Sequence, residues 1–379
     1  MLSRTLGALL VDARTVAQRR RKGMVQQLFE IRRFKRINPS LGAADYYAYR
    51  LYDENYALPS ARGTFVGQRN VRQFAGALNL GQATMPAADK LTFTLLARTF
   101  GLPVPRLKAL YRPGPPLIPG IAEVVLDTPA HLARWLRTSE AWPVFAQPSY
   151  RQRLGCMRLT GYESNTDSIA VSGHQSIPVA AFVDMVIGKM PRRDYAPELG
   201  WFFLEEPRPH PEIARVLGKD TISVLRLILI RDSAGVEFVA AFLNIDTGVN
   251  GQDEPPKTPA LVAEVDLDTG RLGQALNGIW PHANIVTKAP ATGMAIEGFV
   301  LPIWGQARAL CERSASLFPL IQMQDWHIAL TDTGPSFLEL GDLASVQRLQ
   351  LWGRGLLTPR VRKLLAESGN KRFAWLSNT

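Results

Sequence analysis

The stretch Met323–Asp342, MQDWHIALTDTGPSFLELGD, decides the fold because it has the pattern of a β-hairpin. Two apolar runs, 326–330 and 336–340, flank a Thr-Asp-Thr-Gly-Pro turn whose residue types favour chain reversal. Glu339 interrupts the second run. An acidic side chain in a strand otherwise suited to burial needs a cation or a hydrogen-bond partner. The stretch therefore predicts an antiparallel strand pair that carries a candidate metal ligand.

The length and composition favour several packed units. A chain of 379 residues with 46% hydrophobic content can bury large cores, so two or three units are expected. No run of about 18 apolar residues is present, and no membrane-spanning helix is predicted. The apolar stretch 6–11 is too short for a secretory signal and is closed by Asp12, which favours a cytoplasmic location. Cys156 and Cys311 lie far apart and indicate neither a disulfide framework nor a zinc module.

The first 40 residues form a strongly basic segment. They hold ten Lys/Arg and two acidic residues, and so carry +8 of the formal net charge of +11. Val25, Leu28 and Phe29 fall at helical spacing among the cations, which predicts an amphipathic helix. Through residues 1–36 it could rest on an anionic membrane surface or an acidic partner, or dock as a solvated terminal helix. Specific nucleic-acid binding is disfavoured, because the rest of the chain carries only +3.

Strands and helices alternate irregularly along the remaining chain. Asp89 and Lys90 open an amphipathic run that ends at Gly101, and this run predicts a helix. Further helices are predicted at 129–139, 211–217 and 304–318, and strands at 143–147, 168–171, 199–205, 224–230, 236–245 and 261–267. Irregular alternation with several hairpins is typical of the α+β class rather than of a doubly wound parallel sheet.

Arginines in unusual positions indicate possible anion sites. Arg226 lies inside the apolar strand 224–230, where a guanidinium needs a fixed anionic partner. That partner could be a phosphate or carboxylate of a ligand, or the arginine could form a structural salt bridge. Arg151 and Arg153 lie in a turn-rich loop that could cover phosphates or be a solvated turn. The polar loop 248–259 is long enough for a lid or binding loop.

The order of these features resembles the ATP-grasp superfamily, most closely its sugar-transfer-associated branch, which is related to α-L-glutamate ligases. The resemblance covers residues 40–357. It is carried by short motifs in a fixed order, namely Asp-Tyr-Tyr…Asp at 45–53, Asp89-Lys90, Gly-Leu-Pro-Val-Pro at 101–105, Pro143–Pro148, Glu205-Glu206, His210-Pro211, Ser223–Arg226, Leu-Pro-Ile-Trp at 301–304 and the hairpin with Glu339.

The resemblance implies an α+β ATP-grasp fold in which two lobes enclose a nucleotide behind a mostly helical, basic N-terminal region. The expected division is a basic leader at 1–40, a helical region at 41–85, an N-terminal lobe at 86–206, a C-terminal lobe at 207–357 and a tail at 358–379. The N-terminal lobe would contain the phosphate-covering loop, and the C-terminal lobe the metal hairpin.

The resemblance also implies roles for five residues. Lys90 would contact the α and β phosphates of ATP, and Glu205 and Glu206 would flank the adenine and ribose. Arg226 would act catalytically on the γ phosphate or an acyl phosphate, and Glu339 would hold Mg²⁺.

The chain departs from the family pattern at four positions, one of them on the strand near Asn244, where family members commonly carry an arginine and this chain has Leu243 and Asn244. Gln147 stands in place of a lysine, His327 in place of an aspartate and Gly341 in place of an asparagine. Gln147 can hydrogen-bond a phosphate but adds no charge. His327 suits Mg²⁺ poorly and is explained equally well as a core histidine or a catalytic residue. Asp325, on the same strand face, or Asp342 could restore an oxygen ligand.

Two functional hypotheses follow. The first is an ATP-dependent ligase that joins a carboxylate to an amine or similar nucleophile through an acyl phosphate. Its substrates would be small molecules or saccharide-linked groups, in saccharide or secondary-metabolite biosynthesis. The second is a degenerate ATP-grasp protein that binds a nucleotide or a partner without turnover. Phosphoryl transfer to a hydroxyl is a third, weaker hypothesis. The basic leader would place the protein in the cytoplasm, peripheral to the inner face of the membrane.

Overall fold

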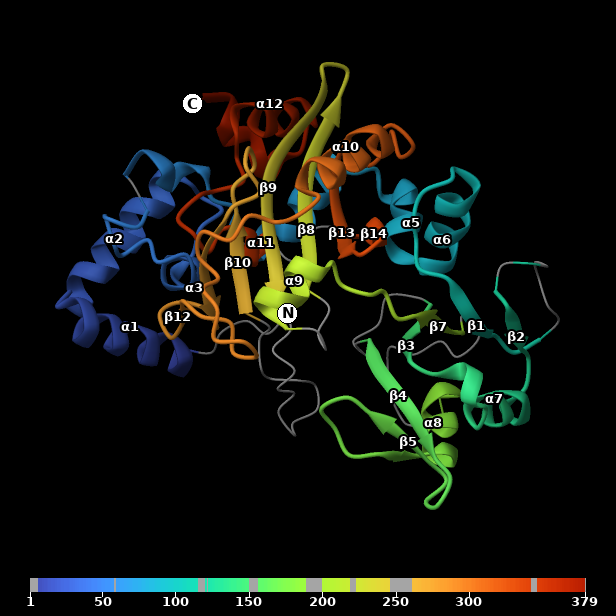
Figure 1. Ribbon diagram of the computed structural model, residues 1–379. Coiled ribbons are helices and arrows are strands. Elements are labelled where there is room, and N and C mark those ends of the chain that lie inside the picture. The colour runs from blue at the N-terminus through green and yellow to red at the C-terminus, as the bar shows by residue number, and fades with distance from the viewer. Residues whose placement is uncertain are drawn as a thin grey trace.

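The computed structural model describes residues 6–57, 59–114, 120, 122–149, 156–188, 200–218, 223–245, 261–341 and 346–378. Within these ranges the chain forms two seven-stranded sheets, with strand orders β2-β1-β7-β3-β4-β5-β6 and β12-β11-β10-β9-β8-β13-β14. Figure 1 shows the two sheets as separate lobes, with the blue N-terminal helices beside the second. Arg151, Arg153, Asp342 and the loop 248–259 lie outside the described residues.

The first sheet forms the N-terminal lobe. Its strands are β1 (Leu107–Tyr111), β2 (Val124–Leu126), β3 (Val144–Pro148), β4 (Met157–Glu163), β5 (Ser168–Val171), β6 (Ile177–Pro178) and β7 (Trp201–Glu205). Helices α7 (Pro129–Leu136) and α8 (Val179–Val186) contribute Leu132, Leu136 and Phe182 to its core. Proline at the first turn and Thr128 as the N-cap explain why α7 begins where it does.

The strands of the second sheet pair antiparallel throughout, and the sheet is covered on both faces. Its strands are β8 (Val224–Asp232), β9 (Gly235–Ile245), β10 (Leu261–Val265), β11 (Leu272–Asn277), β12 (Asn284–Val286), β13 (Met323–Thr331) and β14 (Gly334–Gly341). Helices α9 (Pro211–Leu217) and α10 (Trp304–Ala315) pack in one core. Helices α4 (Val71–Leu78), α11 (Val346–Leu349) and α12 (Pro359–Glu367) pack in another, around Ile228 and Phe242.

Helix α6 (Lys90–Thr99) lies between the two sheets. Its Leu91 packs with Leu107 and Phe202 of the first sheet, whereas Phe93 and Ala97 belong to the core of the second. The helix begins at Lys90 because the side chain of Asp89 caps it by accepting a hydrogen bond from the amide of Leu91. The start of α6 is thereby fixed at the junction of the lobes.

The N-terminal region is helical, as predicted. It consists of α1 (Leu6–Arg20), α2 (Met24–Ile37), α3 (Ala43–Ala48), α4 and α5 (Met85–Ala88), with short 3₁₀ turns between them. Val16 of α1 and Phe34 of α2 pack with the tyrosines of α3 in a separate core. No helix in the described part of the chain is long and apolar enough to cross a membrane.

The structure confirms the α+β class and the hairpins. Strands β13 and β14 pair antiparallel around the predicted turn, and β8 pairs with β9 across Asp232–Gly235. The predicted helices appear as α6, α7, α9 and α10. Strand β12 and helices α8 and α12 were not predicted, although α12 has an end signal, since Thr358 caps it and Pro359 is its first residue.

Candidate functional site

The candidate site is built on one cross-strand row of the second sheet. Phe242, Arg226, His327 and Glu339 face one another in register on β9, β8, β13 and β14. Directly paired residues of antiparallel strands project from the same face, so these four side chains share one surface. Phe242 is fully buried, whereas the side chain of Glu339 is 30% exposed. The row therefore runs from the core towards solvent.

Lys90 joins this row to the first sheet. Its Nζ atom donates to Oε1 of Gln147 at 2.6 Å and lies 3.2 Å from Oε2 of Glu339. Gln147 belongs to β3 and Glu339 to β14, so one ammonium group holds a side chain from each sheet. The backbone amide of Lys90 also donates to the carbonyl of Ser149 at 2.8 Å. Three positions widely separated in the sequence thus meet where the lobes adjoin.

Glu339 has a cationic or hydrogen-bonding partner for each carboxylate oxygen. Nδ1 of His327 lies 2.7 Å from Oε1 of Glu339, and Lys90 faces Oε2. Burial acts to raise the pKa of Glu339, but the charges of His327 and Lys90 outweigh it and hold this pKa well below its ordinary value. Glu339 is therefore ionised at neutral pH and already compensated within the protein.

Arg226 forms a buried ion pair with Asp325. Nε of Arg226 donates to Oδ1 of Asp325 at 2.8 Å, and Nη2 donates to Oδ2. Asp325 has no exposed surface, and the guanidinium also lies 5.3 Å from the ring centre of Phe242. Burial would raise the pKa of Asp325, yet Arg226 and His327 keep it below its ordinary value. The sequence left two kinds of partner open for Arg226, an anionic group of a ligand or a structural salt bridge, and the structure shows the salt bridge.

The departures at His327 and Gly341 are sterically linked. A Cβ atom at Gly341 would lie 3.0 Å from Nε2 of His327 and 3.3 Å from the backbone carbonyl of Asp325. Among the described residues Nε2 of His327 has no hydrogen-bond partner, and it lies 3.6 Å from Oδ1 of Asp325. The imidazole thus occupies the space that a side chain at 341 would need. A histidine at 327 and a glycine at 341 therefore fit each other.

The described residues do not fit a bound Mg²⁺ ion. The carboxylate oxygens of Asp325 are paired with Arg226, and those of Glu339 face Lys90 and His327. Gly341 has no side chain that could bind a metal. Within the described ranges no group of three or more His, Cys, Asp or Glu is arranged to hold a metal. A divalent cation prefers several unpaired oxygen ligands and would be repelled by the ammonium beside Glu339.

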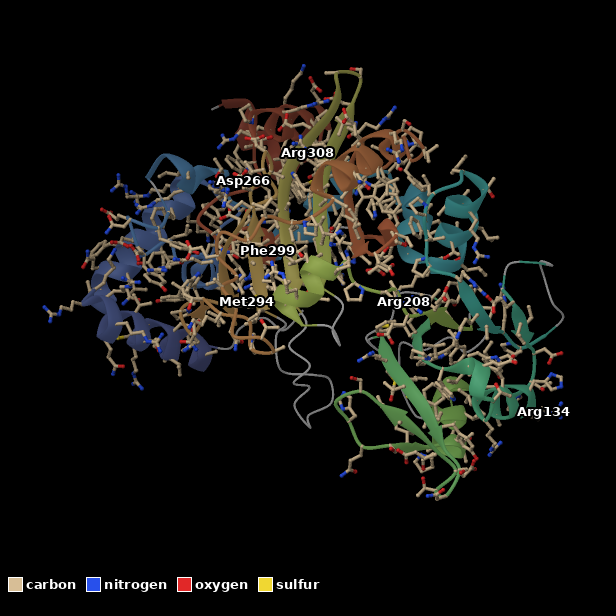
Figure 2. The ribbon with its side chains drawn as sticks, viewed as in Figure 1. Arg134, Arg208, Asp266, Met294, Phe299 and Arg308 are labelled. Carbon is tan, nitrogen blue, oxygen red and sulfur yellow. The ribbon has the colours of Figure 1, made fainter. Side chains whose placement is uncertain are left out.

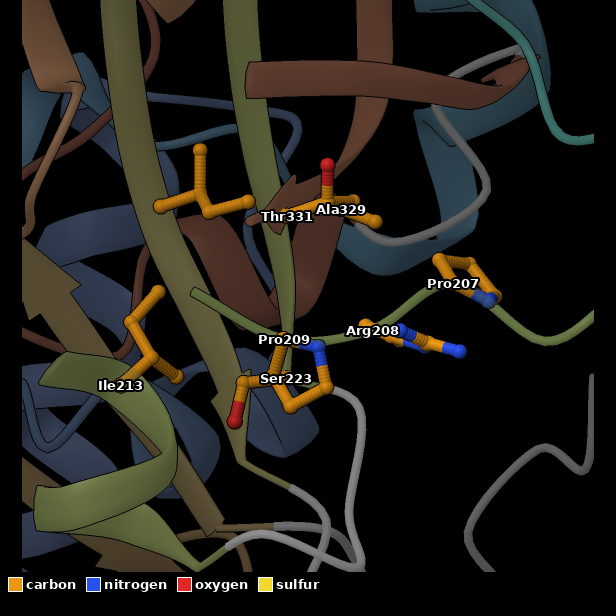
Figure 3. Close-up of a pocket in the computed structure, with 8 residues that line it drawn as sticks. Pro207, Arg208, Pro209, Ile213, Ser223, Ala329 and Thr331 are labelled. Carbon is orange, nitrogen blue, oxygen red and sulfur yellow. The ribbon is translucent and has the colours of Figure 1, made fainter. Parts of the chain in front are cut away.

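Glu205 and Glu206 lie at the end of β7, where the chain leaves the first sheet. Glu206 pairs with Arg158 at 2.8 Å and is largely buried, whereas Glu205 is 45% exposed and 3.7 Å from Arg106. The segment that follows leads to the second lobe, and Figure 2 labels Arg208 on it. This connection borders a shallow pocket with room for no ligand, lined by Pro207, Arg208, Pro209, Ile213, Ser223, Ala329, Leu330 and Thr331 (Figure 3).

Two neighbours of the site were not predicted. Cys156 is an exposed residue, and burial of its thiol raises the pKa of this thiol to about 12, with smaller effects of the Lys90 charge, which lowers the pKa, and of the Glu339 charge, which raises it. The charges of Lys90 and Glu339 thus act on this thiol. Arg348, on α11, has its pKa lowered by burial and by the charge of Arg226. No sequence motif marks either residue.

The comparison with protein families matches residues 206–365 to an ATP-grasp family. The family is the one described as sugar-transfer associated ATP-grasp, and the match covers less than half of the chain. Over these residues the chain is similar to that family, in agreement with the resemblance seen in its motifs. The matched residues include β8, β13 and β14, the strands that carry Arg226, His327 and Glu339.

Solved structures resemble the chain only distantly. They include N5-carboxyaminoimidazole synthase from Aspergillus clavatus, in complex with ADP and 5-aminoimidazole ribonucleotide (11% identity, TM-score 0.35, 73% of this chain and 51% of that chain). The D-alanine–D-alanine ligase from Coxiella burnetii has 11% identity and a TM-score of 0.39, covering 79% of this chain and 61% of that chain.

The L-amino acid ligase from Bacillus licheniformis has 9% identity and a TM-score of 0.32, covering 69% of this chain and 41% of that chain. The chain spans about half the length of the first of these structures, and no activity is transferred from them. A comparison with curated proteins finds no match.

Proposed function

We propose that the protein is an ATP-dependent ligase that activates a carboxylate as an acyl phosphate. The observation that carries this proposal is the convergence of Lys90, Gln147, Arg226, His327 and Glu339 at the junction of the two sheets. Lys90 would bind the phosphates as a compact cation, and Gln147 would add a neutral hydrogen bond. The sugar-transfer association of the family supports a saccharide-linked substrate.

The proposed chemistry has two balanced steps. A carboxylate oxygen of the substrate bonds to the γ phosphorus while the bond to the β–γ bridging oxygen breaks, which gives an acyl phosphate and ADP. An amine or similar nucleophile then bonds to the acyl carbon and loses a proton, and inorganic phosphate leaves. Lys90 and Arg226 would neutralise the charge that spreads over the transferred phosphoryl group. His327 would orient Glu339 through its Nδ1 contact.

The test is ATP binding and turnover by the purified full chain. Lys90→Ala should weaken the binding of ATP about 10- to 150-fold in calorimetry, because a charge-assisted hydrogen bond is worth about 1.5–3 kcal/mol. Lys363→Ala, on the exposed surface of α12, is the matched control. Formation of ADP that depends on an added carboxylate and amine would support the ligase. Equal ATP affinity in Lys90→Ala and the wild type would contradict it.

A second candidate function is nucleotide binding without turnover. It is favoured by the pairing of Glu339 with Lys90 and His327 and by the missing side chain at Gly341. This candidate predicts ATP binding with or without Mg²⁺ and no ADP formation. A magnesium-dependent turnover that Glu339→Ala abolishes would exclude it, whereas Glu367→Ala serves as the control on an exposed glutamate.

For the N-terminal region we propose peripheral binding to an anionic membrane surface. Val25, Leu28 and Phe29 of α2 are 67%, 58% and 65% exposed, so the helix turns apolar residues outward. Helices α1 and α2 and the turn between them also carry eight exposed cations, namely Arg14, Arg19, Arg20, Arg21, Arg32, Arg33, Lys35 and Arg36. Exposed apolar side chains within a basic field suit the interface of an anionic bilayer. An acidic partner protein is the alternative occupant.

Sedimentation with vesicles tests the membrane proposal. Deleting α1 and α2 would remove the buried Val16 and Phe34, so substitution of the exposed residues is the cleaner change. The triple serine variant at 25, 28 and 29 should lose binding to phosphatidylserine-containing vesicles, whereas Leu320→Ser, which is 55% exposed elsewhere, should retain it. Equal sedimentation of the wild type and the triple variant would contradict the proposal.

A further inference from the structure

Glu339 is the carboxylate on which a divalent cation at this site would depend, and both of its oxygens are already engaged. Oε2 lies 3.2 Å from the ammonium nitrogen of Lys90, and Oε1 lies 2.7 Å from Nδ1 of His327. An ionised carboxylate only accepts hydrogen bonds, so Nδ1 carries the proton. A metal ion could reach Oε2 only by displacing the ammonium group. Lys90 and a divalent cation would therefore compete for the same oxygen.

Asp325, on the same strand face as His327, is held by a buried ion pair. Its two oxygens accept hydrogen bonds from Nε and Nη2 of Arg226, and the residue has no exposed surface. Transfer of either oxygen to a metal would break one of these bonds, and loss of a buried ion pair strongly destabilises a fold. Asp325 therefore stabilises the sheet and is not available as a metal ligand.

Position 341 has no space for a ligand while His327 is present. A Cβ atom at Gly341 would lie 3.0 Å from Nε2 of His327, which is closer than the usual separation of non-bonded heavy atoms. His327 itself offers only a nitrogen there, whereas Mg²⁺ prefers oxygen ligands. The imidazole thus excludes two oxygen ligands, one at its own position and one at 341.

The ammonium group of Lys90 provides positive charge at the place that a metal ion would take. Gln147, which is buried, accepts a hydrogen bond from it at 2.6 Å, so the group is held between Gln147 and Glu339. A triphosphate without bound metal carries more negative charge than its Mg²⁺ complex, and a cationic side chain attracts it more strongly. A cation that is already in position therefore suits the metal-free nucleotide.

We propose that this site binds a nucleoside triphosphate without a divalent cation, and that Lys90 and His327 lie where the cation would otherwise be. The inference rests on the nucleotide binding proposed above, which both candidate functions share, and it does not require turnover. It predicts that Mg²⁺ leaves the affinity for the nucleotide unchanged or lowers it. Asp342 lies outside the described residues, so its carboxylate is tested separately.

The first experiment compares nucleotide binding with and without metal. A non-hydrolysable ATP analogue is titrated by calorimetry into the full-length protein, once with EDTA and once with excess Mg²⁺. The affinity of the wild type should be equal in the two buffers or higher in EDTA. An affinity that Mg²⁺ raises by more than about twofold would overturn the proposal. Loss of that rise in Asp342→Asn would assign the metal to this carboxylate instead.

The second experiment restores oxygen ligands with the double variant His327→Asp and Gly341→Asn. A carboxylate then replaces the imidazole, and the amide side chain at 341 takes the space that the imidazole leaves. Mg²⁺ should raise the affinity of this variant for the analogue by about tenfold or more, and should raise its unfolding midpoint without nucleotide. His174→Asp, in an exposed turn, is the matched control and should behave as the wild type.

A folded double variant on which Mg²⁺ has no effect would contradict the proposal. If the double variant does not fold, the comparison of the two buffers with the wild type still decides between the outcomes, because it needs no substitution.

Failure of the proposed function gives a different result. No binding of the analogue in either buffer would contradict nucleotide binding itself, and the inference would fail with it. Binding that only Mg²⁺ permits would support nucleotide binding and overturn the inference. Binding that Mg²⁺ does not raise, without formation of ADP from ATP, would support the inference and exclude the ligase.

Discussion

The buried pair between Arg226 and Asp325 gives the sharpest prediction on stability. Asp325→Asn keeps the shape of the side chain but removes its charge, and so breaks the ion pair of a guanidinium that is 6% exposed. Two charges about 4 Å apart interact by about 4 kcal/mol at an effective dielectric constant of 20. Breaking a buried pair by removing one partner costs about 3–5 kcal/mol. The Coulomb energy and the cost of breaking a buried pair thus give a loss of folding stability of the same size.

The assay is thermal unfolding, and the measured quantity is the midpoint temperature of the transition of the C-terminal lobe. For a unit of this size, 1 kcal/mol shifts the midpoint by roughly 2–4 °C, so Asp325→Asn should lower it by about 6–20 °C. The pKa of Asp325 lies below its ordinary value of 3.8, so its stabilising effect is complete above that value and is lost as the pH falls below it. The difference between the variant and the wild type should therefore shrink in acid.

Two controls make the result specific. Arg137 and Asp167 form a similar two-bonded pair at 2.7 Å, but their side chains are 41% and 50% exposed, so Asp167→Asn should cost less than about 1 kcal/mol. The double variant Arg226→Met with Asp325→Leu should recover most of the lost stability, because no charge is left uncompensated. A midpoint of Asp325→Asn within 2 °C of the wild type would refute the reasoning.

Three further predictions concern single residues. Burial raises the pKa of Glu264, so the folded protein binds a proton on this carboxyl more tightly than the unfolded chain does. The stability that this proton provides is lost as the pH rises above the pKa of the folded state. Glu264→Gln should therefore raise the unfolding midpoint at pH 7.5 but change it little at pH 4. Burial raises the pKa of Cys156, so its alkylation is followed by mass spectrometry in strongly alkaline buffer, where thiolate forms; this alkylation should slow when ATP is added, whereas the buried Cys311 should stay unlabelled, and labelling that ATP leaves unchanged would contradict the proposed phosphate position. Gly341→Ala should destabilise the protein by about 1–3 kcal/mol, and His327→Ala should relieve most of that loss in the double variant; strictly additive losses in chemical denaturation would show that the two positions are independent.

The hairpin of β13 and β14 shows how far local sequence can predict the fold. Its turn residues and apolar runs specify β13 and β14 without knowledge of the rest of the chain. The sequence also indicated that Arg226, as a charged residue inside an apolar strand, needs an anionic partner, and Asp325 is such a partner. These signals are local because strand alternation and turn chemistry depend on neighbours a few residues away.

The partners themselves could not be predicted in this way. Arg226 and Asp325 are 99 positions apart, and their contact exists because β13 pairs with β8 in one particular register. A shift of one residue would turn Asp325 to the opposite face. Lys90 and Gln147 likewise meet only because α6 lies between the sheets. Arg348 gave no signal at all, since an arginine in a short helix is ordinary until its surroundings are known.

The dual attachment of Lys90 has a consequence for the motion of the lobes. Its ammonium group holds Gln147 from one sheet and Glu339 from the other, so the lobes cannot separate at this point without breaking one of these contacts. A triphosphate that binds Lys90 would compete for the same three N–H donors. The group that joins the two sheets is thus the group that the nucleotide would contact, so binding of the nucleotide and breaking of this junction would be one event.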